Sequence, residues 1–174
     1  INEVTARGVR HIRYQATDFD YGKNKLSPQA WGDIGFAGLR VHYPLKSEAY
    51  RDELVVFLGA SYFRALGRDN VYGLSARGIA VDTVEPTGEE FPSFVEFWLV
   101  TPKPTDNHVV LYALMDSRSV TGAYRFDVRP GDELQVQAGD RRVNLRVRGS
   151  LPGTRPERLL GVMDLGFAQW RLDR

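Results

Sequence analysis

The sequence predicts an all-β protein built as an antiparallel β-sandwich. Apolar and polar residues alternate along many short stretches of the chain, which is the pattern of half-buried strands. Clusters of glycine, proline, asparagine and aspartate separate these stretches, as expected for turns. Many short strands joined by turns are typical of a sandwich rather than of βαβ units.

Composition limits the size and the partners of this protein. With 174 residues, 43% of them hydrophobic, we expect one domain over residues 1–174 with a single core. A net charge of +1, from 23 basic and 22 acidic residues, argues against nucleic acid or an anionic membrane as partner. The chain has no cysteine, which excludes disulfides and thiolate metal sites and leaves the compartment open. No apolar run is long enough to span a membrane, and the opening Ile-Asn-Glu-Val lacks signal-peptide features, so we expect a piece of a longer protein.

The first third of the chain contains two expected strands and a loop. Residues 7–14 alternate, with Val9 set against Arg10, and predict a strand. Residues 18–30 are polar and contain glycine and proline, as in an exposed loop. In the next strand Leu39, Val41 and Tyr43 share one face, and we expect Pro44 to end it because proline cannot donate to the ladder.

The segment from Glu53 to Leu66 fits either a helix or a pair of strands. Leu54, Leu58 and Tyr62 match a helical stripe, whereas Val55, Phe57 and Phe63 match extended pairing. Gly59 favours strands, because glycine inside a helix costs about 1 kcal/mol relative to alanine.

Two further strands are expected on either side of a turn at residues 85–88. Residues 79–83 predict a short strand. Residues 94–101 are apolar on both faces, with Val95, Phe97 and Leu99 on one and Phe94, Trp98 and Val100 on the other. Such a strand is buried on both sides, which implies layers above and below it.

The remaining strands show clear alternation. Residues 109–115 predict an antiparallel neighbour of 94–101, and residues 121–129 predict the next strand, with Tyr124, Phe126 and Val128 on one face. Two more strands follow, around residues 134–136 and 143–147, joined at residues 138–140. The expected core contains Phe97, Leu99, Leu111, Phe126 and Val128.

The segment between Gly59 and Thr83 is the candidate binding region, because it concentrates aromatic and guanidinium side chains beside glycines. The side chains able to offer donors or flat faces are Tyr62, Arg64, Tyr72, Ser75 and Arg77. A polar ligand is one interpretation. The alternative is that the arginines are structural partners of Asp69, Asp82 or backbone carbonyls.

Few catalytic chemistries fit the sequence. His11, His42 and His108 lack the paired spacing of a metal site, and we expect no metal or other cofactor. Ser75 lies in no nucleophile elbow, and no phosphate-binding loop is present in the sequence. Carboxylates remain as candidates for glycoside chemistry, which needs two of them: Asp82, Glu89, Glu90, Glu96 and Asp116.

Among these carboxylates Glu96 has the most apolar neighbours, Phe94 and Trp98. Burial there would raise its pKa, and pairing with Arg64 or Arg77 would keep it ionised. The alternative is a buried ion-pair partner with no catalytic role. Glu89 and Glu90 lie in a predicted turn and are expected to be solvated or to bind ligand.

Several long blocks of this sequence resemble a known family. The blocks are GASYFRALG, VYGLSARGIAVDT, PTGEEFPSFVEFW, PKPTD, YALMDS and TGAYRF. They resemble the osmoregulated periplasmic glucan biosynthesis proteins G and D, over about residues 1–130. Residues 131–174 diverge, and only residues 160–162 are similar to what the family would have there.

The resemblance implies part of a large sandwich of galactose-mutarotase-like form, in periplasmic proteins that make or trim β-1,2-linked glucans. Members are similar to endo-β-1,2-glucanases, whose acid and base aspartates lie in motifs downstream of the matched blocks, so the catalytic residues are unknown here. The implied binding residues are Tyr62, Arg64, Tyr72, Ser75, Arg77, Glu89, Glu90, Glu96 and Trp98.

Two hypotheses therefore stand. The first is a glucan-active enzyme, or part of one, and the second is a noncatalytic carbohydrate-binding or structural module. An incomplete sandwich leaves strand edges unpaired, so we also expect a tendency to dimerise.

Overall fold

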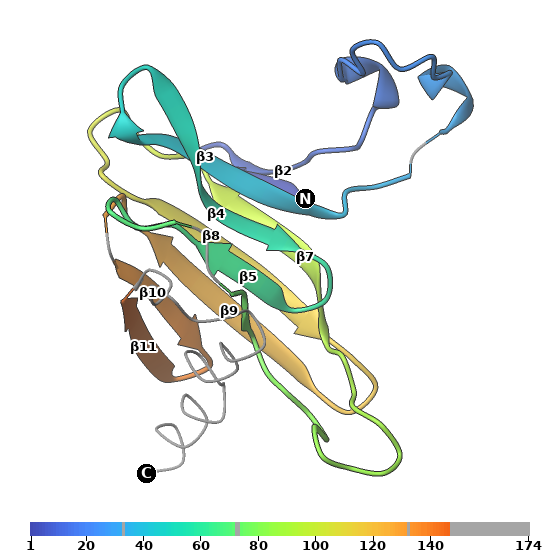
Figure 1. Ribbon diagram of the computed structural model, residues 1–174, viewed down its shortest axis with the longest axis vertical. Helices are drawn as coiled ribbons and strands as arrows, with labels where there is room; N and C mark the ends of the chain where they lie inside the picture. The colour runs from blue at the N-terminus through green and yellow to red at the C-terminus, as the bar shows by residue number, and fades with distance from the viewer. Residues whose placement is uncertain (33, 72–73, 132, 147–174) are drawn as a thin grey trace.

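Two packed β-sheets form the protein in the computed structural model, which describes residues 1–32, 34–71, 74–131 and 133–146 (Figure 1). The larger sheet has the order β11-β10-β9-β8-β7-β1-β2 and the smaller one the order β3-β4-β5-β6. The strands of the larger sheet are β1 (Asn2–Thr5), β2 (Gly8–His11), β7 (Ser93–Val100), β8 (Val109–Asp116), β9 (Thr121–Val128), β10 (Glu133–Ala138) and β11 (Arg141–Arg146). Those of the smaller sheet are β3 (Gly38–Ser47), β4 (Tyr50–Leu58), β5 (Tyr62–Ala65) and β6 (Ala76–Arg77). The all-β sandwich predicted from the sequence is confirmed.

Aromatic rings from both sheets form the centre of the core. Phe57 of β4 lies 4.8 Å from Phe126 of β9 and 5.3 Å from Phe97 of β7, measured between ring centroids. Phe63 of β5 lies 5.2 Å from Phe126. The expected core is confirmed: Phe97, Leu111, Phe126 and Val128 are buried, and Leu99 is partly buried against them.

The meander β7-β8-β9 follows the predicted alternation. Leu111, Ala113 and Met115 of β8 are buried, and β8 pairs antiparallel with both neighbours. On the outward face of β9, however, Asp127 is also buried, because Arg125 and Arg129 lie 3.4 and 3.3 Å from its carboxylate. The predicted hairpin of β10 and β11 is also present, whereas Val147 lies outside the described residues.

The strand pair expected between Glu53 and Leu66 is confirmed as β4 and β5. Gly59 and Ala60, with φ of +74° and +45°, make the turn between them. Glycine adopts this left-handed conformation without steric cost, which explains its place there.

Pro44 does not end β3, contrary to the prediction. The strand continues to Ser47, with register irregularities on both sides of Tyr43. The missing proline N–H is tolerated because the ladder is already irregular there. Tyr43 is consequently exposed, whereas Leu45 is buried.

The prediction of a short strand at residues 79–83 is wrong. Only an isolated bridge between Val81 and Glu90 forms there, and the strand is instead β6. Asp82 has a φ of +56°, which interrupts an extended chain. Gly78 lies so close to the Phe94 ring that an added Cβ would be only 3.0 Å from it.

β7 is not buried on both faces as expected. A register shift between Phe94 and Glu96 turns Phe94 to the same side as Phe97, with 5.7 Å between their rings, and leaves Val95 exposed. Glu96 and Trp98 face away from the core and are half-buried. Among the described residues the smaller sheet covers the core face of β7, and the implied second layer is not seen on the other face.

β1 was not expected from the sequence, and it pairs parallel with β7, placing Asn2 opposite Trp98. The larger sheet is therefore mixed rather than purely antiparallel. Between β2 and β3 the chain leaves the two sheets as an N-terminal arm, residues 12–32 and 34–37 (Figure 1). The loop expected at residues 18–30 lies within this arm, which contains two short 3₁₀ turns, η1 (Ala16–Asp18) and η2 (Pro28–Ala30).

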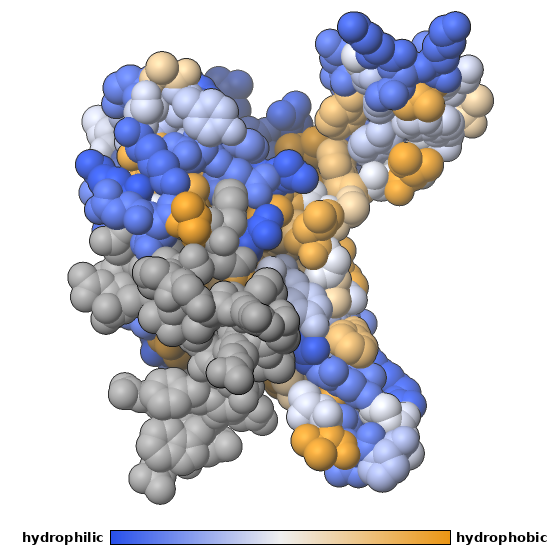
Figure 2. Space-filling model, viewed as in Figure 1, coloured by the Kyte–Doolittle hydropathy of each residue, from blue (hydrophilic) through white to orange (hydrophobic). Residues whose placement is uncertain are grey.

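Helical structure is sparse: within the part of the chain that the structure describes, no helix has the length and apolar character needed to cross a bilayer. Hydropathy on the visible face is mixed, with orange apolar groups on the arm and along the sandwich between blue polar ones (Figure 2).

Truncating Phe126 should destabilise the fold strongly. Phe126 is fully buried between the two sheets, so Phe126→Ala should lower the free energy of unfolding by about 3–5 kcal/mol, from lost burial and a cavity. Urea unfolding followed by circular dichroism measures this change. Tyr50→Ala, at a side chain that is 67% exposed, is the control and should change it by less than about 1 kcal/mol. Equal losses in the two variants would contradict this core.

Candidate functional site

Arg77 lies at the centre of a group of polar and aromatic side chains on the smaller sheet. Its Nε donates a hydrogen bond of 2.6 Å to the Tyr62 hydroxyl, and its Nη1 pairs with Glu89. The guanidinium carbon is 4.9 Å from the centre of the Tyr62 ring and 5.1 Å from that of Phe91. We call these four residues, Tyr62, Arg77, Glu89 and Phe91, the Arg77 cluster.

Strand pairing explains why the Arg77 cluster forms. Tyr62 and Arg77 are direct cross-strand neighbours on β5 and β6. Phe63 points into the core, so Tyr62 and Arg64 project from the outward face. The bridge between Val81 and Glu90 then brings residues 89–91 back alongside β6.

The arginine partners differ from those considered in the sequence. Arg77 pairs with Glu89 rather than with Asp69 or Asp82. Arg64 lies 3.7 Å from Glu53, which also pairs with Arg40 at 3.0 Å. Sequence reasoning missed Glu53 and Phe91, because both reach their arginines from other segments of the chain.

The structure places the other residues of the candidate binding segment only in part. Ser75 is exposed and directly precedes β6. Tyr72 lies outside the described residues. Of the candidates in this segment, the structure therefore places Tyr62 on β5, Arg77 on β6 and Ser75 just before β6.

Glu90, which lies just before β7, forms hydrogen bonds with the turn between β8 and β9. Its two carboxylate oxygens accept hydrogen bonds of 2.5 Å from the Ser117 and Ser119 hydroxyls, and the Ser119 backbone N–H adds a bond of 2.9 Å. These donors, with Arg118 at 3.7 Å, lower the pKa of Glu90 to about 2. Glu90 is thus an ionised acceptor held by the fold; of the two alternatives expected from the sequence, a solvated acid does not apply, and ligand binding stays a prediction.

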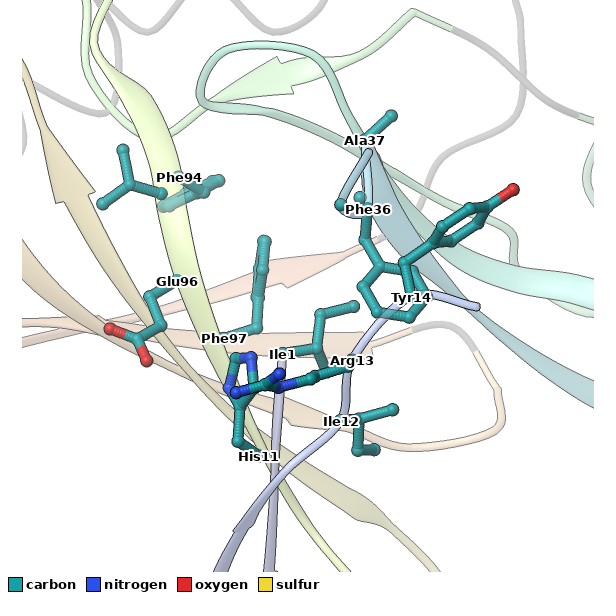
Figure 3. Close-up of a pocket in the computed structure, with 13 residues that line it drawn as sticks. Ile1, His11, Ile12, Arg13, Tyr14, Phe36, Ala37, Phe94, Glu96 and Phe97 are labelled. Carbon is teal, nitrogen blue, oxygen red and sulfur yellow. The ribbon is translucent and has the colours of Figure 1, made fainter. Parts of the chain in front are cut away.

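Glu96 lies in a different place, at the mouth of a pocket of about 330 Å³ (Figure 3). Its Oε1 accepts a hydrogen bond of 2.7 Å from Asn2 Nδ2, and Asn2 Oδ1 lies 3.0 Å from His11 Nδ1. The two arginines considered as possible partners of Glu96 lie beside other carboxylates, Arg64 beside Glu53 and Arg77 beside Glu89.

Trp98 follows Glu96 on the same outward face of β7. It lies between Asn2 of β1 and Tyr112 of β8 and is half-buried. Trp98 and Glu96 therefore lie on the larger sheet, whereas Arg77 lies on the smaller one.

The predicted site residues therefore divide into separate groups. Tyr62, Arg77 and Glu89 come together, Glu90 holds a turn, and Glu96 lines a pocket. No group of three or more metal-ligating side chains occurs in the described ranges. The three histidines contact different partners: Asn2 for His11, the Arg51 carbonyl for His42 and Asn107 for His108.

Comparisons with known proteins match this chain to one family. The model of the family described as periplasmic glucan biosynthesis protein, MdoG, matches residues 1–155. The resemblance thus extends beyond residue 130, where the sequence analysis expected it to end.

Curated relatives show the same similarity. A glucans biosynthesis protein G from Pseudomonas paraeruginosa is 52% identical over 158 residues, which cover 90% of this chain and 30% of that protein. Proteins of the same name from Ralstonia nicotianae and Pectobacterium atrosepticum are each 52% identical, over 136 and 140 residues. They match 78% and 79% of this chain and 27% of their own length. This chain therefore spans less than a third of the length of these relatives.

Removing the Glu90 carboxylate should change how stability depends on acid. Because the folded-state pKa is depressed from 4.5 to about 2, Glu90 stabilises the fold above pH 4.5, and this contribution is lost as the pH falls toward 2. Glu90→Gln should therefore flatten the loss of stability across that window. Urea midpoints measured at intervals from pH 6 to 2.5 test this. Glu85→Gln, at an exposed side chain in the preceding turn, is the control and should leave the acid dependence unchanged.

Proposed function

We propose that this chain, which belongs to the MdoG family of periplasmic glucan biosynthesis proteins, contributes a binding surface for the glucan backbone. The periplasm is the proposed location, as the family description has it. β-1,2-linked glucan is the proposed ligand, from the resemblance of the sequence blocks around Tyr62 and Arg77. Binding is proposed to use Tyr62, Ser75, Arg77 and Glu89, with Phe91 added by the geometry.

The observation that carries this proposal is the position of Arg77 within about 5 Å of the centres of two aromatic rings, those of Tyr62 and Phe91. Sugar rings have an apolar C–H face that packs on aromatic side chains and a rim of hydroxyls that needs hydrogen-bond partners. A guanidinium has five N–H donors, and the contacts with Tyr62 and Glu89 use two of them. These contacts also fix the guanidinium plane, so that little side-chain entropy is lost when a ligand binds.

Binding rather than cleavage is the proposed contribution of this chain. Cleavage of a glycosidic bond needs an acid and a base flanking it. Glu89 is paired with Arg77, and Glu90 is held ionised by serine donors, so neither is placed to donate a proton at neutral pH. A glucan-active parent protein would draw its catalytic pair from elsewhere.

Changing Arg77 should weaken glucan binding. Arg77→Ala removes a hydrogen bond to a charged donor worth about 1.5–3 kcal/mol, which is roughly a ten- to hundredfold loss of affinity. Arg77→Lys should also bind weakly, because an ammonium lacks the planar fork of donors and its stacking on aromatic rings. Calorimetric titration with a linear β-1,2-glucan measures both, with the exposed Arg68→Ala as control. Unchanged affinity in folded Arg77→Ala would place binding elsewhere.

The purified chain should not cleave the glucan. Proton transfer by a positioned acid or base contributes about 10²- to 10⁴-fold each, and loss of both would remove most of the rate. Incubation with linear β-1,2-glucan should therefore release no new reducing ends above the uncatalysed background. Release of short oligosaccharides by the pure chain, abolished by Glu96→Gln, would overturn this and make Glu96 a catalytic acid.

A further inference from the structure

The pocket beside Glu96 lies where the N-terminal arm joins the two sheets (Figures 1 and 3). One wall is residues 94–97 of β7, and the opposite wall is formed by residues 11–14 and 35–38, the two ends of the arm. Along this wall β7 pairs with β8, the Phe94 backbone N–H donates to the Ala60 carbonyl, and the Phe97 carbonyl accepts from the Asn2 amide. At about 330 Å³ the pocket is within the range of small-ligand sites.

The apolar walls of this pocket are aromatic. Phe94 and Phe97 belong to the packed core, which fixes their rings. Phe36 lies at the other side of the pocket, edge-on to Tyr14 at 5.5 Å, and is 37% exposed. Figure 3 shows Phe36 and Tyr14 together at one end and Glu96 at the other. A ligand between them would meet flat apolar faces and a carboxylate.

The polar groups of the pocket are held in place. Asn2 is 5% exposed, and its Nδ2 bridges the Glu96 carboxylate and the Phe97 carbonyl at 2.7 and 3.3 Å. His11 contacts the other side of the Asn2 amide. Glu96 is thereby oriented by a neutral donor, so its carboxylate keeps acceptor capacity for a ligand.

The charges that line the pocket favour a neutral ligand. Glu96 contributes a negative group and Arg13 a positive one, and His11 adds a titratable ring. A cation would meet Arg13, and an anion would meet Glu96. A polyhydroxylated ring satisfies both, since its hydroxyls donate to Glu96 and accept from Arg13, while its C–H face packs on the partly exposed Phe36.

We propose that this pocket binds one glucosyl unit of the glucan, as a second subsite separate from the Arg77 cluster. This inference rests on the proposed glucan-binding function. It assigns a role to Arg13 and Phe36, which sequence reasoning did not single out, and separates Glu96 from the other predicted binding residues. The arm contributes residues 12–14 and 35–37 to the subsite.

The test is calorimetric titration of the purified chain with a β-1,2-linked glucose disaccharide and with a longer linear β-1,2-glucan. Phe36→Ala should weaken binding of both sugars about two- to tenfold, on the scale of one lost aromatic contact. Phe19→Ala is its matched control, because Phe19 also stacks on Tyr14, at 5.2 Å, but does not line the pocket. Arg13→Gln is compared with Arg7→Gln, at an exposed arginine on the turn between β1 and β2.

Glu96→Gln tests the carboxylate with the fold preserved, because the glutamine oxygen can still accept from Asn2. Loss of disaccharide binding in Phe36→Ala, Arg13→Gln and Glu96→Gln, with both controls unchanged, supports the subsite. Glucan binding that is lost in Arg77→Ala but unchanged in these three variants overturns the subsite and leaves the proposed function standing. If binding is lost only in the pocket variants, the subsite is supported and the proposed role of Arg77 in glucan binding is overturned. A chain that binds neither sugar overturns both.

Discussion

The contact between Phe57 and Phe126 joins the two sheets, and the rest of the structure depends on it. Their rings are 4.8 Å apart, and the Phe63 and Phe97 rings pack on the same pair. With Phe63 directed inward, alternation directs Tyr62 outward, toward Arg77. With Phe94 and Phe97 both directed inward, β7 needs a bulge, and Glu96 follows that bulge on the outward face, where it lines the pocket. One aromatic core therefore sets both candidate binding surfaces.

The two surfaces differ in how their charges are compensated. Arg77 is paired with a carboxylate and lies against aromatic rings, so it is fixed before any ligand arrives. Glu96 is held by a neutral amide, which orients the carboxylate without neutralising it. The first arrangement suits a rigid platform for a polymer, and the second suits a pocket that meets one unit at a time.

Local alternation was enough to predict most strands, because one face of each packs on the core. It predicted β4, β5, β8 and β9 well, with Gly59 marking their first turn. β1 was not predicted, because its four residues form a strand by pairing with β7, which lies far along the chain. The bulge in β7 was not predicted either. The alternation of apolar and polar residues does not show where two residues of one strand lie opposite a single residue of its neighbour. For the site, composition found Arg77 and Glu96 but not Glu89 as the partner of Arg77, because that pair depends on how the loop after β6 returns.

The parallel pairing of β1 with β7 has a kinetic consequence. It joins residues 2 and 98, so closing this ladder costs the entropy of a long loop. β1 should therefore dock late in folding, after the hairpins β3-β4 and β8-β9 have formed from neighbouring segments. Asn2, which orients Glu96, belongs to that late strand. The pocket is then the last part of the sandwich to be assembled, and its opening can occur as a local event while the aromatic core stays closed.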